Sequence, residues 1–130
     1  MRGLGGFGHK GTVKNVFPAI PKRAPDMIAT ETTTKNQAIL YRLCNDRNPL
    51  HIDPEMAKMG GFEAPILHGL CTKGISVKAV QQHFFKENPE RLKQVSVRFT
   101  SHVFPGETLV ISAWKEKDTI IFASKTKERK

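Results

Sequence analysis

Residues 65–85 read PILHGLCTKGISVKAVQQHFF, and this stretch decides the fold. Its apolar side chains cover most of a helical surface, so the pattern predicts a long helix that is largely buried. Pro65 suits the first turn of a helix, which places the predicted start there. Gly69 and Gly74 would each cost about 1 kcal/mol against alanine inside a helix, so we expect something to approach the backbone closely at both positions.

The sequence after this helix changes to a period of two residues. Val95, Val97 and Phe99 alternate with polar side chains, and a similar alternation runs through 109–114. A predicted turn leads to a third run at 119–127, so three antiparallel strands are expected in this half of the chain. Helices followed by an antiparallel meander indicate an α+β fold, in which a curved sheet wraps around the one long helix.

Three shorter elements are predicted before the long helix: a strand at 26–31, a helix at 34–44 and a short helix at 54–59. Thr34 starts the first of these helices, because it forms a capping-box pattern with Gln37. Asp53 can cap the short helix, and Pro54 suits its first turn.

The bulk properties of the chain limit what it can be. It has 130 residues and a net charge of +9. Residues 1–25 are rich in glycine, proline and lysine, so they are interpreted as a linker-like arm before a single domain at 26–130. The charge favours anionic partners, but no nucleic-acid-binding motif accompanies it, and no apolar run is long enough to span a membrane.

Cys44 and Cys71 form no CxxC pair, so both are interpreted as free thiols in a reducing compartment.

A polar stretch before the long helix, NDRNPLHIDP at 45–54, carries residues suited to chemistry. Asp46 and His51 could hold one water from two sides, which suits hydrolysis or the addition of water to an activated double bond. Pro49 and Pro54 each fix φ, so the two side chains would be presented on a stiffened turn.

Simpler interpretations of these residues stay open. Asp46 could close the preceding helix in an Asx turn, and His51 could be a partly buried histidine satisfied by a backbone carbonyl. A metal site of Asp46, His51 and Asp53 matches no zinc or calcium spacing well, so no metal is predicted.

The start of the long helix offers a second functional group. A helix N-terminus has free N–H groups and a positive dipole end, and Gly69 has no side chain to block its own N–H. A thioester or ester oxygen could be stabilised there as negative charge develops on it. Gly69 could instead be a helix-packing glycine, and the neighbouring His68 is interpreted as structural rather than catalytic.

A long pattern of fixed residues now identifies a resemblance. YRLCNDRNPLHIDPEMAKMGGFEAPILHGLCTKG at 41–74 resembles the hydratase 2 motif of the MaoC-like (R)-specific enoyl-CoA hydratases. The match continues through VRFTSHVFPGETL at 97–109 and AWKE at 113–116, and back to IPKRAPD at 20–26. It covers roughly residues 18–125.

The resemblance implies a hot-dog fold and a reversible syn hydration of trans-2-enoyl-CoA to (3R)-3-hydroxyacyl-CoA in fatty acid metabolism. Asp46 and His51 match the family's catalytic pair, and Asn48 matches the residue that helps to place them. Gly69 matches the oxyanion donor, and the remaining substrate-binding positions are Phe99, Arg47, Pro49 and Leu50. The family uses no cofactor and no metal, and the phosphates of coenzyme A would account for the positive charge.

The sequence departs from the family pattern at two places. Cys44 and Asn45 stand where Ser and Gly are expected, and Asn is tolerated if φ is positive there. The family's eukaryotic enzymes carry two hot-dog repeats, and one more strand is expected after the C-terminal KTKERK. The chain is therefore expected to be a fragment, a truncated product, or a stand-alone form that works as a homodimer or pairs with a second hot-dog.

Two alternative functions and an alternative location stay open. An acyl-CoA thioesterase would direct water to the carbonyl, and a non-catalytic acyl-CoA-binding domain would bind without turnover. The resemblance implies a peroxisomal location, but the Ser-Lys-Leu address is not seen at the C-terminus, which leaves a cytoplasmic location as the alternative.

Overall fold

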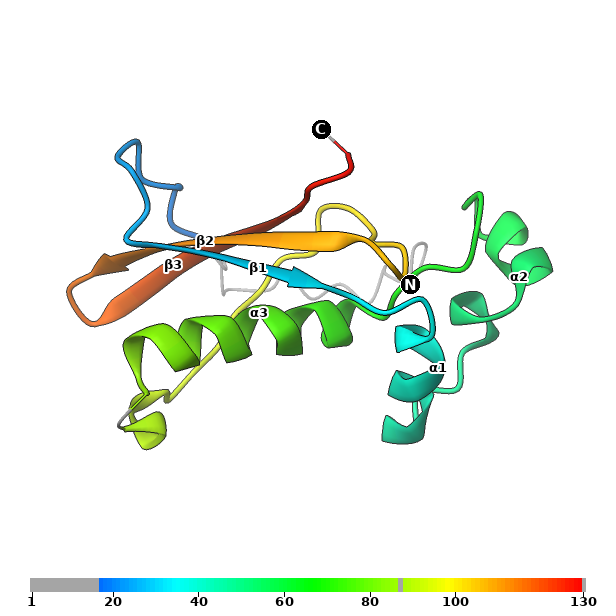
Figure 1. Ribbon diagram of the computed structural model, residues 1–130, viewed down its shortest axis with the longest axis horizontal. Helices are drawn as coiled ribbons and strands as arrows, with labels where there is room; N and C mark the ends of the chain where they lie inside the picture. The colour runs from blue at the N-terminus through cyan, green and yellow to red at the C-terminus, as the bar shows by residue number, and fades with distance from the viewer. Residues whose placement is uncertain (1–16, 87, 130) are drawn as a thin grey trace, which may run out of the picture.

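The computed structural model describes residues 17–86 and 88–129. Within them a three-stranded antiparallel sheet lies against one long helix, α3, which crosses a single face of the sheet (Figure 1). The elements are β1 (Met27–Thr32), α1 (Gln37–Tyr41), α2 (Pro54–Met59), α3 (Gly69–Phe84), β2 (Thr108–Glu116) and β3 (Thr119–Thr126), with short 3₁₀ turns η1 (Arg42–Cys44), η2 (Pro49–His51) and η3 (Pro89–Arg91). The predicted α+β class is confirmed, and no helix of the described residues is both long and apolar enough to cross a membrane.

The central strand β2 organises the sheet. It pairs with β1 from Met27↔Ala113 to Thr32↔Thr108, and with β3 from Leu109↔Thr126 to Glu116↔Thr119. Its alternating side chains follow the predicted period of two, because one set faces the core and the other does not. The buried set is Leu109, Ile111 and Ala113, and it shares a core with Cys71, Ala79 and Val80 of α3.

The long helix begins four residues later than predicted, at Gly69 rather than Pro65. The N–H of Leu67 donates to the carbonyl of Val103 at 2.7 Å, which holds the segment before the helix in an extended conformation. His68 is the N-cap residue, with φ −57° and ψ 131°. A tertiary hydrogen bond therefore overrides the helical start that Pro65 favours locally.

The prediction that this helix is largely buried is also wrong for one of its faces. Leu70 is 56% exposed, and a side chain built at Gly74 would meet nothing within 4 Å. Only one face of α3 is covered, because the sheet in the described residues lies on one side of it (Figure 1).

The strand predicted around Val95 to Phe99 does not join the sheet. Val95 and Val97 are half-buried and Ser96 and Arg98 are exposed, so the alternation itself is present. The segment nevertheless has no strand partner among the described residues. A period of two specifies an extended backbone, whereas a strand also needs a neighbour for its N–H and C=O groups.

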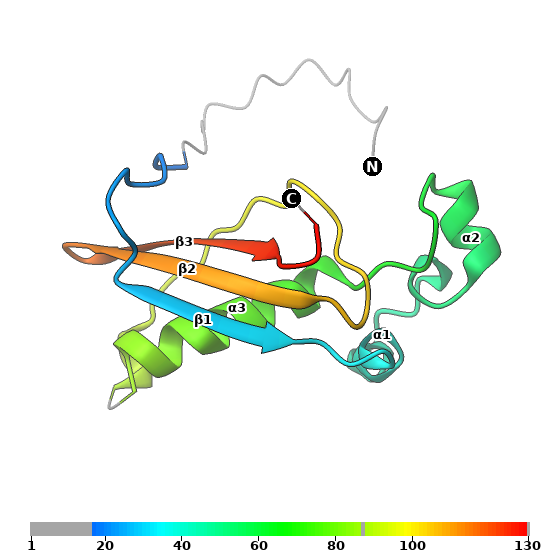
Figure 2. The ribbon, with the colours of Figure 1, turned by 45° about the horizontal axis from the view of Figure 1, so that its top comes forward.

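The two short helices lie beyond one end of the sheet, beside the N-terminal end of α3 (Figures 1 and 2). The first starts at Gln37 rather than Thr34, because the Thr34 hydroxyl bonds to the Gln37 side chain and no side-chain cap bond forms. The second has the predicted bounds, and the carboxylate of Asp53 accepts from the N–H groups of Glu55 and Met56.

A cluster of charges fixes the start of β1. Arg23 forms a two-pronged ion pair with Asp26 at 2.7 and 2.8 Å, and the N–H of Lys115 donates to the same carboxylate. These contacts, chiefly the bond from Arg23, lower the pKa of Asp26 to about 2. Residues 17–25 have no regular secondary structure, and residues 1–16 of the predicted arm lie outside the described residues.

We expect Asp26→Asn to reduce the dependence of stability on pH. A carboxyl group with a lowered folded pKa contributes stability above its ordinary pKa of 3.8 and loses it as the pH falls towards about 2. Urea unfolding should show the variant less stable than the unmodified chain at about pH 5, with the difference shrinking between about pH 4 and pH 2. Asp118→Asn, an exposed aspartate of the β2–β3 hairpin, is the control, and a pH-independent difference for Asp26→Asn would contradict the assignment.

Candidate active site

The loop that carries Asp46 begins with a residue in the left-handed conformation. Asn45 closes η1 with φ +73° and ψ 8°, and its N–H donates to the carbonyl of Arg42 at 3.0 Å. Asn45 therefore adopts a positive φ, which asparagine tolerates better than most residues, as the sequence predicted. Cys44, the last residue of η1, is an exposed free thiol, whereas Cys71 is a buried one.

Side-chain hydrogen bonds within the loop hold its polar residues in place. Asn48 caps η2, because its Oδ1 accepts from the N–H of Leu50 at 3.0 Å. The N–H of Asn48 donates to Oδ1 of Asp46 at 3.4 Å, which is the Asx turn considered from the sequence. The guanidinium of Arg42 donates to the carbonyl of Arg47 at 2.8 Å. Asn48 thus orders the turn that presents both Asp46 and His51.

His51 is tied to the segment that leads into α3. Its Nδ1 lies 2.7 Å from the carbonyl oxygen of Ile66, and a carbonyl can only accept, so Nδ1 carries the proton. The neutral ring therefore has its free lone pair at Nε2. The simple interpretation of His51, satisfaction by a backbone carbonyl, is correct for one nitrogen, and that bond leaves the other nitrogen available for chemistry.

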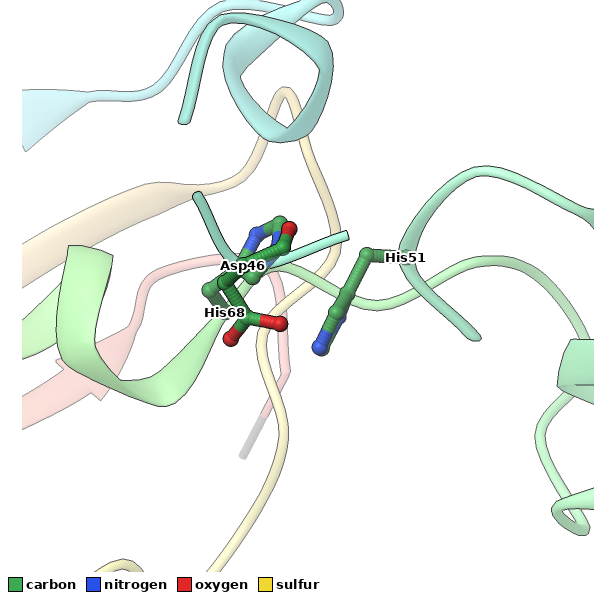
Figure 3. A group of neighbouring side chains, drawn as sticks. All are labelled: Asp46, His51 and His68. Atoms are coloured by element: carbon green, nitrogen blue, oxygen red, sulfur yellow. The ribbon is translucent and has the colours of Figure 1, made fainter. Parts of the chain in front are cut away.

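Three side chains gather at this point: Asp46, His51 and His68, with the Asp46 carboxylate pointing toward the ring of His51 (Figure 3). One nitrogen or oxygen of each lies within 4.8 Å of the corresponding atoms of the other two. Two hydrogen bonds of about 2.8 Å can span such a separation, so one water can bind to Asp46 and His51 together. Asp46 is exposed, His51 is half-buried and His68 is buried, so water reaches the group from one side.

The same three residues do not suit a metal ion well. The rings of His51 and His68 are stacked, with centroids 3.7 Å apart and an interplanar angle of 28°. A metal binds in the plane of each imidazole that holds it, and two stacked rings direct their lone pairs along nearly parallel planes. The arrangement favours acid–base chemistry, and Asp53, the third metal ligand considered from the sequence, is occupied in capping α2.

Gly69 and Phe99 lie against each other although they are 30 residues apart. A Cβ at Gly69 would stand 3.2–3.4 Å from three carbons of the Phe99 ring. Gly69 is the first residue of α3, and its N–H has no hydrogen-bond partner among the described residues. The predicted oxyanion donor and a predicted substrate contact are thus neighbours, and the predicted close approach is correct for Gly69 and wrong for Gly74.

The structure does not gather the remaining predicted substrate contacts in the same way. Arg47 and Pro49 are exposed on the loop. Leu50 packs at the end of α2 instead, where its Cδ1 lies 3.1 Å from the place of a Cβ on Gly60. Their roles in substrate binding stay predictions.

The contact between His68 and His51 was not predictable from the sequence. The pattern placed His68 beside Gly69, but the contact with His51 depends on how the extended segment before α3 passes the loop. Tyr41, whose ring centroid is 4.7 Å from that of His68, completes the group. Burial raises the pKa of Tyr41.

A sheet lying against one long helix, with Asp46 and His51 beside the N-terminus of that helix, is the arrangement of a hot-dog domain. Residues 16–130 match the family described as MaoC like domain. A crystal structure of a MaoC-like dehydratase from Phytophthora capsici has a TM-score of 0.90 at 44% identity, covering 98% of this chain and 45% of that one. The chain therefore belongs to the MaoC-like domain family, and the predicted hot-dog fold is confirmed.

Two curated relatives extend the comparison. A probable enoyl-CoA hydratase 2 from Dictyostelium discoideum is 54% identical over 129 residues, which make up 97% of this chain and 44% of that protein. The peroxisomal multifunctional enzyme type 2 of Mus musculus is 48% identical over 128 residues, or 97% of this chain and 17% of that enzyme. The chain thus spans less than half the length of these relatives.

Alanine substitutions at the two glycines of α3 should change the free energy of unfolding differently, because the two glycines have different surroundings. We expect Gly74→Ala to raise the free energy of unfolding by about 1 kcal/mol, because the new methyl group meets open space inside a helix. Gly69→Ala should give no such gain, since the Phe99 ring must shift to make room. Urea unfolding of both variants tests this. Adding Phe99→Ala should make Gly69→Ala less unfavourable, and purely additive effects would contradict the contact.

Proposed function

We propose that the chain is an (R)-specific 2-enoyl-CoA hydratase, which adds water reversibly to trans-2-enoyl-CoA to give (3R)-3-hydroxyacyl-CoA. The observation that carries the proposal is the placing of Asp46 and His51. Their side-chain atoms are close enough to hold one water, and the pair lies beside the N–H at the start of α3, which has no partner in the part of the chain that the structure describes. The relatives named as enoyl-CoA hydratases support the same reaction.

The thioester carbonyl would be bound at the N–H of Gly69. Addition of water to C3 pushes electrons towards the carbonyl oxygen, so a donor aimed at that oxygen stabilises the transition state. The positive end of the α3 dipole adds to this effect. The exposed ring of Phe99 lies against Gly69, so it would contact the enoyl group bound there.

The water would be held by the Asp46 carboxylate and the Nε2 of His51. The reacting pair carries one proton, either on the Asp46 carboxyl group or on Nε2 of His51. The member without that proton takes one from the water as its oxygen bonds to C3, and the other member gives its proton to C2 on the same face of the double bond. Transfer of a proton between the two groups then restores the pair, so one water is consumed and no cofactor or metal is needed. His51 acts only through Nε2, since Nδ1 is bonded to Ile66.

The working unit we propose is a pair of hot-dogs, either a homodimer or this domain with a second one. The chain exposes surface that such pairing would cover. Leu70 is exposed on α3, and the extended segment at 92–100 has no strand partner among the described residues. The coenzyme A phosphates are the expected anionic partner of a chain with a net charge of +9.

The proposed location is the peroxisome, within fatty acid β-oxidation. It is supported by the names of the mouse and Arabidopsis thaliana relatives, both of which are peroxisomal enzymes.

The first test is the hydration of crotonyl-CoA and trans-2-decenoyl-CoA, followed by the loss of enoyl absorbance. An (R)-specific dehydrogenase reads the stereochemistry of the product. We expect turnover to the (3R) product. Release of free coenzyme A from a saturated acyl-CoA would favour a thioesterase, and binding without turnover would favour a non-catalytic acyl-CoA-binding domain.

Substituting the pair should remove the activity and leave the fold intact. We expect Asp46→Asn and His51→Ala each to lower kcat by at least about 10²-fold, the usual scale for losing a general acid or base. Asp53→Asn is the matched control, because asparagine also caps helices and Asp53 is engaged at α2. Circular dichroism verifies folding, and near-normal turnover in either variant of the pair would contradict the mechanism.

A further inference from the structure

His68 lies between the two parts of the site and is almost completely enclosed. The residue is 1% exposed. The ring stacks on His51 at 3.7 Å between centroids and packs against Tyr41 on another side at 4.7 Å. The half-buried ring of His51 therefore has a flat, rigid surface behind it, which restricts rotation about its side-chain bonds.

His68 also contacts Asp46, through the backbone. Its Nε2 lies 3.3 Å from the carbonyl oxygen of Asp46, so this nitrogen carries the proton and donates. A single buried ring thus contacts both members of the proposed catalytic pair: the side chain of His51 and the main chain of Asp46.

Burying His68 here is energetically unfavourable for its other ring nitrogen, Nδ1. Nδ1 is buried and has no hydrogen-bond partner among the described residues. Its exposed surface is below 1 Å². A buried acceptor without a partner is unfavourable, and such groups in native structures call for a functional explanation. Burial, followed by the neighbouring His51, lowers the pKa of His68, so the ring is neutral and does not repel a proton on His51.

We propose that His68 is a positioning residue, whose buried ring fixes the orientation of His51 by stacking and steadies the Asp46 main chain by a hydrogen bond. This inference rests on the proposed function, because it assigns His68 a role in holding the acid–base pair. It touches neither the water nor the thioester. Its stacking on His51 is the larger of its two effects, since the exposed Asp46 segment can replace a lost donor with water.

Two substitutions separate the two contacts. His68→Phe keeps a flat ring for stacking but loses the donor to Asp46. His68→Gln reaches the place of Nε2 with an N–H donor but has no ring. His83→Phe and His83→Gln, made at an exposed histidine of α3, are the matched controls for the same chemical changes.

The experiment measures positioning and turnover separately in the full chain. Long-range ¹H–¹⁵N spectra, with His51→Ala to assign the signal, report which nitrogen of neutral His51 carries the proton. We expect Nδ1–H in the unmodified chain and in His68→Phe, and a mixture of the two tautomers in His68→Gln. Hydration of crotonyl-CoA should show kcat lowered at least about 10-fold in His68→Gln and no more than about 3-fold in His68→Phe, with KM nearly unchanged in both.

The two proposals fail in different ways. If His68→Gln keeps the Nδ1–H form of His51, or if folded His68→Phe loses as much activity as His68→Gln, the positioning role is overturned. If the unmodified chain hydrates no enoyl-CoA, the proposed function fails, while the tautomer of His51 in the variants still supports or overturns the positioning role.

Discussion

The hydrogen bond from His51 Nδ1 to the carbonyl of Ile66 joins two parts of the chain that supply different pieces of the site. One is the loop at 45–53, which brings the carboxylate and the imidazole. The other is the extended segment that leads into α3 and brings the N–H of Gly69. Together with the contacts of His68, the N-cap of α3, this bond fixes the pair relative to the helix N-terminus, and a displacement of about 1 Å is enough to reduce catalysis strongly.

A second hydrogen bond makes this arrangement possible. The N–H of Leu67 bonds to Val103, so the residues before α3 stay extended and run past the loop instead of continuing the helix. A helix that started at Pro65 would turn the Ile66 carbonyl along its axis, towards the N–H of a later residue. The carbonyl would then be lost to His51. The late start of α3 is therefore a condition for the site, and the tertiary contact that causes it ties the site to the segment that precedes β2.

Local chemistry made several features predictable from the sequence. The bounds of α2 follow from Asp53, Pro54 and the glycines after Met59, which act within a few residues of one another. The closeness of the Asp46 and His51 side chains is predictable because both lie within one short stretch stiffened by proline. The left-handed Asn45 followed from a family position that is expected to carry glycine.

The features that were not predictable depend on distant contacts. The start of α3 depends on Val103. The extended segment at 92–100 has no strand partner within residues 17–86 and 88–129, and that depends on what lies beside it in space. His68 gives the plainest example. Its place in the sequence is obvious, but its stacking on His51 requires knowing how the two segments cross. Periodicity describes one element at a time, so it cannot supply such crossings.

The exposed thiol of Cys44 offers a chemical handle at the site. It lies two residues before Asp46, at the end of η1, while burial both encloses the thiol of Cys71 and raises its pKa. A thiol-directed reagent reacts with the accessible group first. A small fluorophore or spin label would therefore attach two residues from Asp46 without any engineered cysteine, and its signal would report on ligand binding beside it.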